Sequence, residues 1–362
     1  MSSIYDAVIV GGGVIGCSIA YHLAKQNKKV ILLEKGSVAG KASGAAAGML
    51  GAQMEFTCND PLYPLAIKSR DLFQTLSEEL YRLSGIDIEL IEEGIYQLAF
   101  TEDEAVLHQR RGEQDQQSGE DAYWLTASEL FEREPAISKK AQGALYLPRD
   151  GQVSPKKLTE AFLKSAIALG AEVREYSEVV SFIRHDNCVR GVHTKRDAIF
   201  ARNTILAGGV WSSELDPTLE MVPVKGECLS FTTNRPILKG TVKYKNCYLV
   251  PKKGNRIIVG ATSIPDRFDE NVSFRGLFQL MEMAKEIVPG VVDDQFEKAW
   301  TGIRPQLRKG EPYIGEHKEY EQLFIAAGHY RNGILLSPIT GIMVAEEIMQ
   351  KERQAFANEA SN

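Results

Sequence analysis

The sequence predicts an α/β protein of two domains, in which a doubly wound, largely parallel sheet accompanies a second part with a mixed or antiparallel sheet. Residues 7–10 form a short apolar run that is β-branched at three of its four positions, and a glycine-rich turn follows at once. A helical stretch then leads to a second apolar run at residues 30–33. Such runs are typical of parallel strands buried on both faces, and together they form a βαβ unit. A chain of 362 residues has room for about two domains.

Periodicity and turn residues predict the elements that follow. Ser154 as N-cap, Pro155 in the first turn and Gly170 after the last turn delimit a helix. Strands are expected at residues 172–176, 179–183, 189–194 and 199–206, antiparallel strands of a second sheet at 222–232, 246–250 and 256–260, a buried strand at 323–327, and a final helix at 339–350. Residues 36–51 are mostly small, which indicates a segment that approaches something closely.

Composition excludes several classes of function. The chain has 42 basic and 48 acidic residues, a net charge of −6, which argues against nucleic-acid binding because such binding needs clustered Lys and Arg. Its five cysteines are odd in number and form no C-x-x-C pair, so we expect free thiols, a reducing compartment and no metal site. The sequence also has no apolar run long enough for a membrane span and no basic start of a signal peptide. We therefore expect a cytoplasmic protein that binds no membrane.

Gly11, Gly13 and Gly16 form a G-x-G-x-x-G pattern directly after the first strand and at the start of a helix. In that context the first glycine permits a tight turn, the second lets a pyrophosphate approach the backbone, and the third lets helix and strand pack closely. Glu34 ends the second strand, where a carboxylate accepts hydrogen bonds from ribose hydroxyls and disfavours a 2′-phosphate. The pattern predicts NAD or FAD and argues against NADP.

Two later strands also end in glycine-containing turns, at residues 205–211 and 326–333. The second turn precedes a helix, so strand, turn and helix return late in the chain to the nucleotide. Three such turns around one ligand favour a long one, and we predict FAD rather than NAD.

Six motifs extend this interpretation over essentially the whole chain: YDAVIVGGGVIG, SGAAAGMLGA, VPVKGECLS, NCYLVPKKGNRIIVGAT, GIRPQLRKGEPYIG and AAGHYRNGILLSPITG. In these motifs the sequence resembles the glycine/D-amino-acid oxidase superfamily of flavoproteins, and several are typical of its glycine oxidase branch. We accordingly expect a Rossmann-like FAD-binding domain from residues 1–80, 147–220 and 300–362. Residues 81–146 and 221–299 are expected to form the substrate-binding domain.

The resemblance implies non-covalent FAD, with Val179 on the adenine side through its backbone and residues 329–335 around the isoalloxazine. Together with the glycine pattern, the implied FAD contacts are Gly11, Gly13, Val14, Ile15, Gly16, Glu34, Lys35, Ala42, Ser43, Ala47, Gly48, Met49, Val179, His329, Tyr330, Arg331, Asn332, Gly333, Ile334 and Leu335.

Three residues are implied on the substrate side. Arg304 would bind the substrate carboxylate, Tyr248 would donate a hydrogen bond to it, and Arg331 would lie on the substrate side of the flavin. A planar guanidinium suits this role because it pairs with a carboxylate through two hydrogen bonds. Without the resemblance, each residue also has a purely structural interpretation. Arg304 fits a structural ion pair equally well, Tyr248 fits a position in the hydrophobic core, and Arg331 fits a surface turn. The reaction implied is hydride transfer, so no acid–base residue is predicted.

Three positions depart from the pattern of the family. Asn246 stands where a His is expected, Ser263 where a Met is expected, and Met54 where a small residue is expected. All three are expected near the substrate cavity, where they would change which substrate side chains are tolerated.

The implied activity is oxidative deamination of glycine, and also of sarcosine, N-ethylglycine and small D-amino acids such as D-alanine and D-proline. The products would be glyoxylate or another 2-oxo acid, ammonia or an amine, and H2O2. Glycine imine would feed thiazole formation in thiamin biosynthesis, and the enzymes of the family are usually homotetramers. The alternatives are a sarcosine oxidase, a quinone-linked D-amino-acid dehydrogenase and, from another class, a non-catalytic FAD-binding protein.

Overall fold

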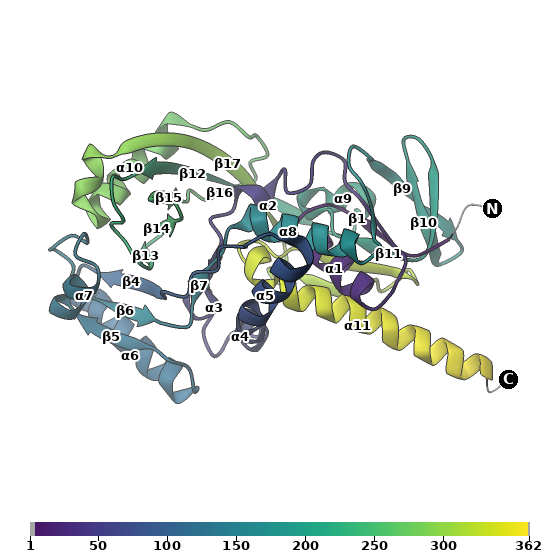
Figure 1. The fold of residues 1–362 in the computed structure, drawn as a ribbon, viewed down its shortest axis with the longest axis horizontal. Helices are drawn as coiled ribbons and strands as arrows, with labels where there is room; N and C mark the ends of the chain where they lie inside the picture. Colours follow the sequence, from purple (N-terminus) through teal and green to yellow (C-terminus); the bar gives the residue numbers. More distant parts are fainter. Residues whose placement is uncertain (1–3, 361–362) are drawn as a thin grey trace.

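Two large β-sheets organise residues 4–360, which the computed structural model describes (Figure 1). The first sheet has a parallel centre in the order β19-β11-β1-β2-β8, with β18 antiparallel at one edge and a β9–β10 hairpin extending β11. Its strands are β1 (Tyr5–Val10), β2 (Val30–Leu33), β8 (Glu172–Arg174), β9 (Val179–His185), β10 (Cys188–Thr194), β11 (Ala198–Leu206), β18 (Tyr313–Glu316) and β19 (Leu323–Ala327). The predicted, largely parallel sheet is thereby confirmed.

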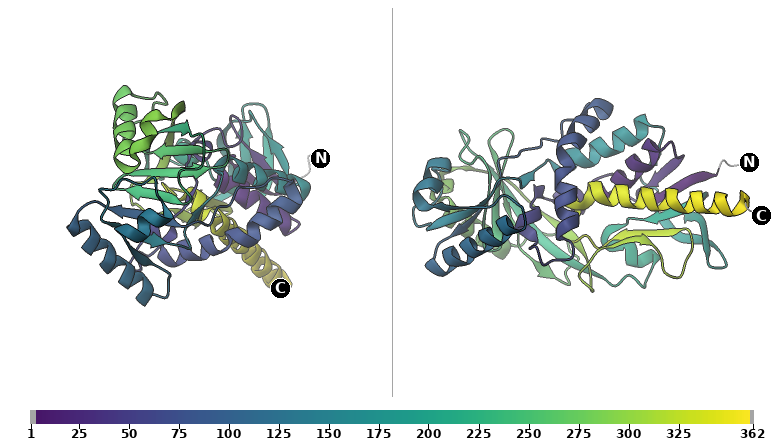
Figure 2. Two further views of the ribbon diagram at one scale, coloured as in Figure 1. Left: turned by 60° about the vertical axis from the view of Figure 1, so that its left-hand side comes forward. Right: turned by 90° about the horizontal axis from the view of Figure 1, so that it is seen from below.

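Strand β1 is buried on both faces, as its apolar sequence predicts. Ala7 and Ile9 face one hydrophobic cluster, whereas Val8 and Val10 face another. Helices α1 (Val14–Lys25), α8 (Pro155–Ala168) and α11 (Gly333–Ala360) contribute to the first cluster, and α11 packs against α1 along this part of the molecule (Figure 2). The α8 boundaries agree with the prediction, but Ser154 makes no side-chain capping hydrogen bond, so the helix starts on Pro155 without that cap.

The second sheet is mixed. Strand β13 pairs with β4 in parallel, and all other neighbouring strands of this sheet pair antiparallel. Its strands are β4 (Ile95–Ala99), β5 (Tyr123–Thr126), β6 (Gly143–Leu147), β12 (Met221–Thr232), β13 (Thr241–Tyr244), β14 (Cys247–Lys252), β15 (Arg256–Gly260), β16 (Ile264–Pro265) and β17 (Gln295–Leu307). Strands β3 (Met49–Leu50) and β7 (Gly151–Gln152) form a separate small sheet. Strand β17 crosses residue 300, so the proposed domain boundary there falls inside a strand, and the division into domains stays a prediction.

Helices cover both sheets. They are α1 (Val14–Lys25), α2 (Ala42–Ala45), α3 (Ala52–Glu55), α4 (Tyr63–Asp71), α5 (Phe73–Ser84), α6 (Glu102–Gln117), α7 (Ala127–Arg133), α8 (Pro155–Ala168), α9 (Ser212–Leu215), α10 (Phe274–Ile287) and α11 (Gly333–Ala360), with 3-10 turns at Gly209–Trp211 and Pro289–Asp293. The last helix begins before residue 339, where the sequence predicted it. Among residues 4–360, no helix combines the length and apolarity needed to cross a membrane.

The parallel strands of the first sheet end at one edge. Strands β1, β2, β11 and β19 end at Val10, Leu33, Leu206 and Ala327, respectively. A loop follows each of these strand ends. In open α/β sheets, ligands bind at this carboxyl edge. The arrangement therefore brings the three glycine-containing turns and Glu34 to one place.

Candidate active site

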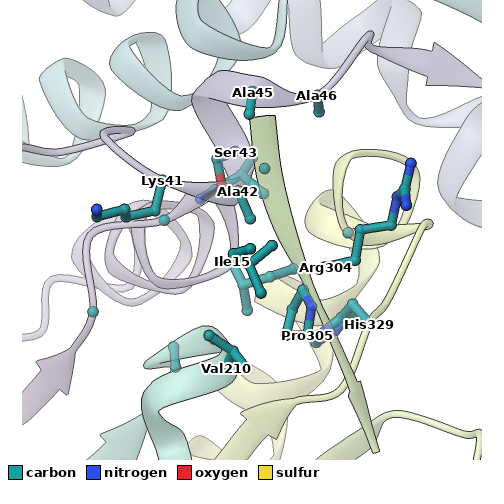
Figure 3. Close-up of a pocket in the computed structure, with 18 of the residues that line it drawn as sticks. Ile15, Lys41, Ala42, Ser43, Ala45, Ala46, Val210, Arg304, Pro305 and His329 are labelled. Carbon is teal, nitrogen blue, oxygen red and sulfur yellow. Dashed lines mark hydrogen bonds between the residues drawn. The ribbon is translucent and has the colours of Figure 1, made fainter. Parts of the chain in front are cut away.

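A cavity of about 420 Å³ lies at this edge, and residues of the second sheet complete its wall. Figure 3 shows that the labelled lining residues come from separate segments, among them Ile15 of α1, Ser43 of α2, Val210 after β11, Arg304 of β17 and His329 after β19. The site is thus assembled by the fold and not by one stretch of sequence.

The glycine turn is shaped by close backbone contacts. Gly11 has a φ of +113°, and an added Cβ would lie 2.4 Å from the carbonyl oxygen of Ala207. A Cβ on Gly16 would lie 2.0 Å from the carbonyl oxygen of Gly11. Gly11 and Gly13 line the cavity, whereas Gly16 stands behind it and lets α1 pack against the turn.

Glu34 ties the end of β2 to the glycine turn. Its carboxylate accepts hydrogen bonds from the backbone N–H of Gly12 at 2.7 Å and of Gly36 at 2.8 Å. Across the turn, Ser43 Oγ accepts the N–H of Val14 at 2.9 Å, the first helical residue of α1. These bonds hold a carboxylate and a helix N-terminus on the same wall of the cavity.

The segment of small residues lies against β17. Trp300 Nε1 donates a 2.9 Å hydrogen bond to the carbonyl oxygen of Ala45. A Cβ on Gly302 would lie 2.7 Å from the Cβ of Ala45. The close approach that the composition of residues 36–51 indicated is therefore made to a strand of the second sheet.

Most of the residues predicted to contact FAD line the cavity. They are Gly11, Gly13, Val14, Ile15, Glu34, Lys35, Ala42, Ser43, Ala47, Gly48, Met49, Val179, His329, Tyr330, Arg331, Asn332, Gly333 and Ile334. Leu335 is not among the lining residues and is buried in the hydrophobic cluster to which α1 and α8 contribute. The ligand contacts themselves stay predictions.

His329 is a buried member of this wall. Its Nε2 lies 3.0 Å from Thr340 Oγ1 of α11. Burial lowers the pKa of the His329 imidazole to about 4, so the ring is neutral at physiological pH. It contributes shape and a fixed hydrogen bond to the cavity without charge.

Arg304 enters the cavity from β17. Its Nη1 donates a 3.1 Å hydrogen bond to the carbonyl oxygen of Thr262, and within residues 4–360 its guanidinium has no carboxylate within ion-pair distance. The structural ion pair that was the alternative for this residue is therefore not formed. The remaining N–H groups of the guanidinium are free for an anionic ligand.

Tyr248 is buried on β14 and lines the same cavity. Its Oη lies 3.8 Å from Cys228 Sγ on β12. Burial raises the pKa of the Tyr248 phenol well above its usual value, although the charge of Arg304 opposes the shift. The phenol is therefore a neutral hydrogen-bond donor across the physiological range.

Arg331 lies at the cavity rim and is about one third exposed. Its Nη2 donates to Glu55 Oε1 at 3.0 Å, and Lys243 Nζ lies 3.7 Å from the same carboxylate oxygen. Glu55 thus neutralises part of the positive charge of this rim. Asn246 and Ser263 line the cavity as expected.

Met54 lies elsewhere than predicted, since it was expected near the substrate cavity. It does not reach the cavity but packs with Ile95, Ala122, Leu145 and Leu147 in a separate hydrophobic cluster. The short helix α3 turns the side chain of Met54 away and places its neighbour Glu55 on the cavity wall. The resemblance in sequence does not show which residue of α3 faces the cavity.

Several lining residues were missed. Gly226, Cys228 and Gly302 come from the facing strands β12 and β17, and Trp211 comes from the turn after β11, where Lys35 Nζ lies 4.0 Å from its ring centroid. The interior glycines of β12 and β17 were a usable signal, because a glycine inside a strand often marks close approach of another group.

Comparison with known proteins agrees with this geometry. The sequence profile of the family described as "FAD dependent oxidoreductase" matches residues 6–347. The chain belongs to this FAD-dependent oxidoreductase family. It is 46% identical to a glycine oxidase of Geobacillus kaustophilus over 97% of this chain and 95% of that protein. It is 31% identical to a bifunctional protein ThiO/ThiG of Trichormus variabilis over 96% of this chain and 53% of that protein.

The fold is shared with solved members of the FAD-dependent oxidoreductase family. The crystal structure of glycine oxidase from Geobacillus kaustophilus superposes with a TM-score of 0.93 at 45% identity, covering 96% of this chain and 95% of that one. The shared fold comprises both the parallel sheet and the mixed sheet, as predicted.

The cavity of this FAD-dependent oxidoreductase fits its cofactor. The side-chain-free turn at Gly11 and Gly13 lets a pyrophosphate approach, and the first turn of α1 carries no acidic residue. Phosphate is favoured at such a helix N-terminus. Glu34 would hold the ribose, and the neutral wall that includes Ile15 and His329 would face the isoalloxazine. When bound, FAD supplies the hydride acceptor.

Proposed function

We propose that this protein is a glycine oxidase. It would convert glycine, water and O2 to glyoxylate, ammonia and H2O2, with non-covalent FAD as cofactor. One observation carries the proposal: Arg304, whose guanidinium has no ion-pair partner among residues 4–360, and the neutral phenol of Tyr248 line the same cavity as the glycine turn before α1. The similarity to a glycine oxidase over nearly the whole chain supports it.

The residues of the chain would bind and orient the substrate. Arg304 would pair with the carboxylate through two hydrogen bonds, and Tyr248 would donate a third. A substrate fixed in this way presents its α-carbon in one orientation, which is the main contribution of a protein to a hydride transfer. Arg331 would close the substrate side at the rim. No side chain is assigned as an acid or base, because the amine is expected to lose its proton on binding.

Sarcosine, N-ethylglycine, D-alanine and D-proline are proposed as further substrates. Asn246 and Ser263, both uncharged, line the cavity, and we propose that they accommodate a small substituent on the amine or the α-carbon. One methyl group in such a pocket changes transition-state binding by only about 1–3 kcal/mol. We therefore expect activity to be graded over these amines.

We further propose a cytoplasmic homotetramer that acts in thiamin biosynthesis. The odd number of cysteines and the missing C-x-x-C pair support a reducing compartment. The similarity to bifunctional ThiO/ThiG proteins supports the pathway. Glycine imine, formed before hydrolysis to glyoxylate, would be the product used for the thiazole.

Two measurements separate this proposal from its alternatives. Acid precipitation of the yellow holoprotein should leave the flavin in the supernatant, whereas a flavin that stays with the pellet would indicate covalent attachment of the kind found in sarcosine oxidases. A quinone-linked dehydrogenase would reduce artificial dyes with glycine or D-alanine and form little H2O2. A non-catalytic FAD-binding protein would show neither reaction.

A further inference from the structure

We infer that Gly226 and Gly260 are positioning residues for the substrate-binding pair, because each supplies a side-chain-free surface against which one member of the pair lies. The inference rests on the proposed function, in which Arg304 and Tyr248 bind the substrate carboxylate. It concerns two glycines on neighbouring strands, β12 and β15, of the second sheet.

The register of the strands places these residues side by side. Cys228 of β12 pairs with Gly260 of β15, and Gly260 in turn pairs with Tyr248 of β14. On the other side of β12, Gly226 pairs with Gly302 of β17, two residues from Arg304. Paired residues of an antiparallel sheet share a face. Arg304 and Tyr248 therefore project onto one face from opposite sides of the glycines.

Arg304 lies against Gly226. An added Cβ on Gly226 would stand 2.5 Å from Nη2, 2.6 Å from Cζ and 2.7 Å from Nη1 of Arg304. These distances are far below van der Waals contact, so the guanidinium could not keep its place above any other residue. The guanidinium therefore lies directly over the backbone of Gly226.

Tyr248 lies against Gly260 in the same way. A Cβ on Gly260 would stand 2.5 Å from Oη and 2.6 Å from Cε2 and Cζ of Tyr248. The ring crosses the glycine and brings Oη to within 3.8 Å of Cys228 Sγ. The phenol ring therefore lies over Gly260 of β15, the strand between β14 and β12.

The φ angle does not explain either glycine. Neither Gly226 nor Gly260 has a positive φ, so φ does not restrict these positions to glycine. Glycine inside a strand weakens the sheet. At each position the contact with a site residue is a reason for the missing side chain.

A second contact holds Arg304 from the side. Its Nη1 donates to the carbonyl oxygen of Thr262, and Thr262 Oγ1 accepts the N–H of Glu227 at 2.9 Å. The buried Glu227 carboxylate accepts the N–H of Ser273 at 2.8 Å, at the start of α10. Gly226 and Thr262 together therefore restrict the positions that the guanidinium can take.

The test is a double-mutant cycle on ligand binding to the holoprotein. The ligand is glycolate, a carboxylate that lacks the amine, and its binding is followed by the visible spectrum of the bound flavin. The variants are Gly226→Ala, Arg304→Ala and the double variant. The Gly226→Ala protein should fold, since the displaced group is the end of a flexible side chain. Gly290→Ala is the matched control, because Gly290 has no positive φ and no other atom within 4 Å of an added Cβ.

We expect Gly226→Ala to raise the Kd of glycolate by about tenfold or more, as for loss of hydrogen bonds to a charged group. In the Arg304→Ala background the same change should have no further effect, a result that a general structural defect would not give. Equal losses in both backgrounds, or an unchanged Kd in Gly226→Ala, would overturn the inference. If Arg304→Ala itself leaves the Kd unchanged, the proposed function fails instead.

A second, independent double-mutant cycle on glycolate binding combines Gly260→Ala with Tyr248→Phe. The added Cβ should displace the Tyr248 ring and weaken glycolate binding, and Tyr248→Phe should remove most of that effect, because the hydroxyl that is displaced is then absent. Full retention of glycolate affinity in Gly260→Ala would contradict the assignment of this second glycine.

Discussion

The carboxylate of Glu34 accepts the backbone N–H of Gly12 at 2.7 Å, so the end of β2 is tied to the glycine turn that follows β1. Both lie on the wall of the same cavity. This bond fixes the acidic group beside the N-terminus of α1, the two features that a dinucleotide fingerprint needs in one place.

Removing the Glu34 carboxylate is expected to weaken FAD binding. Glu34→Ala should raise the Kd of FAD by about 10- to 100-fold, because a hydrogen bond to a charged acceptor is lost and the Gly12 amide loses its partner. Titration of the apoprotein with FAD measures this. Glu175→Ala is the control, since Glu175 accepts the N–H of Val38 on the exposed surface and does not line the cavity. Equal losses in both variants would contradict the role of Glu34.

Truncation of Arg304 tests the carboxylate anchor. Arg304→Ala should lower kcat/KM for glycine by about 10²- to 10³-fold, the usual cost of removing one partner of a buried charge pair, while the flavin spectrum is kept. Arg308→Ala provides the control, because Arg308 follows the end of the same strand and is exposed beside Glu220. Turnover that survives the loss of Arg304 would show that another group binds the carboxylate.

Tyr248→Phe should raise KM for glycine by about tenfold through loss of one hydrogen bond. Because burial raises the pKa of the Tyr248 phenol, the wild-type protein should lose no substrate affinity through this group as the pH rises to about 10, the pKa of an unperturbed tyrosine. A pH profile of kcat/KM for wild type and variant checks both statements. Tyr244→Phe, on the neighbouring strand β13 and outside the cavity, is the control.

Stability should fall in mild acid. Burial, with a further contribution from the charge of Lys25, lowers the pKa of His22 from 6.5 to about 4. Between these values the unfolded chain binds a proton that the folded protein does not, so the free energy of unfolding decreases as the pH falls from 6.5 to 4. The decrease due to His22 reaches about 3 kcal/mol at most.

The measurement is the thermal midpoint of the holoprotein against pH, for wild type and His22→Phe. His22 packs against Tyr21 and Phe162, where an uncharged ring is accommodated, so the variant should show a flatter decline and unchanged activity at neutral pH. His193→Phe, at an exposed position, should retain the wild-type decline. If the thermal midpoint of His22→Phe falls with pH as steeply as that of the wild type, His22 is not the cause of the loss of stability.

Much of the first sheet and its ligand edge could be predicted from the sequence. The apolar run before Gly11, the spacing of the glycines and the position of Glu34 are local signals, and local signals are what a single sequence displays. The segment from His329 to Ile334 lies on the cavity wall, and its position after a buried strand is likewise a local signal.

Other features depend on contacts between distant segments. The roles of Gly226 and Gly260 require the register of four strands, which no local pattern specifies. Met54 and Leu335 pack in hydrophobic clusters and do not line the cavity, because tertiary packing decides which residues of a short or newly started helix are buried. The parallel pairing of β13 with β4, about 150 residues apart along the chain, joins two segments that share no sequence signal.

The most direct test of the account is the stoichiometry of glycine oxidation by the purified holoprotein in an oxygen electrode. The account predicts that one O2 is consumed, and one glyoxylate, one ammonia and one H2O2 are formed, for each glycine. Reduction of the bound flavin by glycine without oxygen uptake would contradict the oxidase assignment, and a flavin that glycine does not reduce would contradict glycine as the substrate.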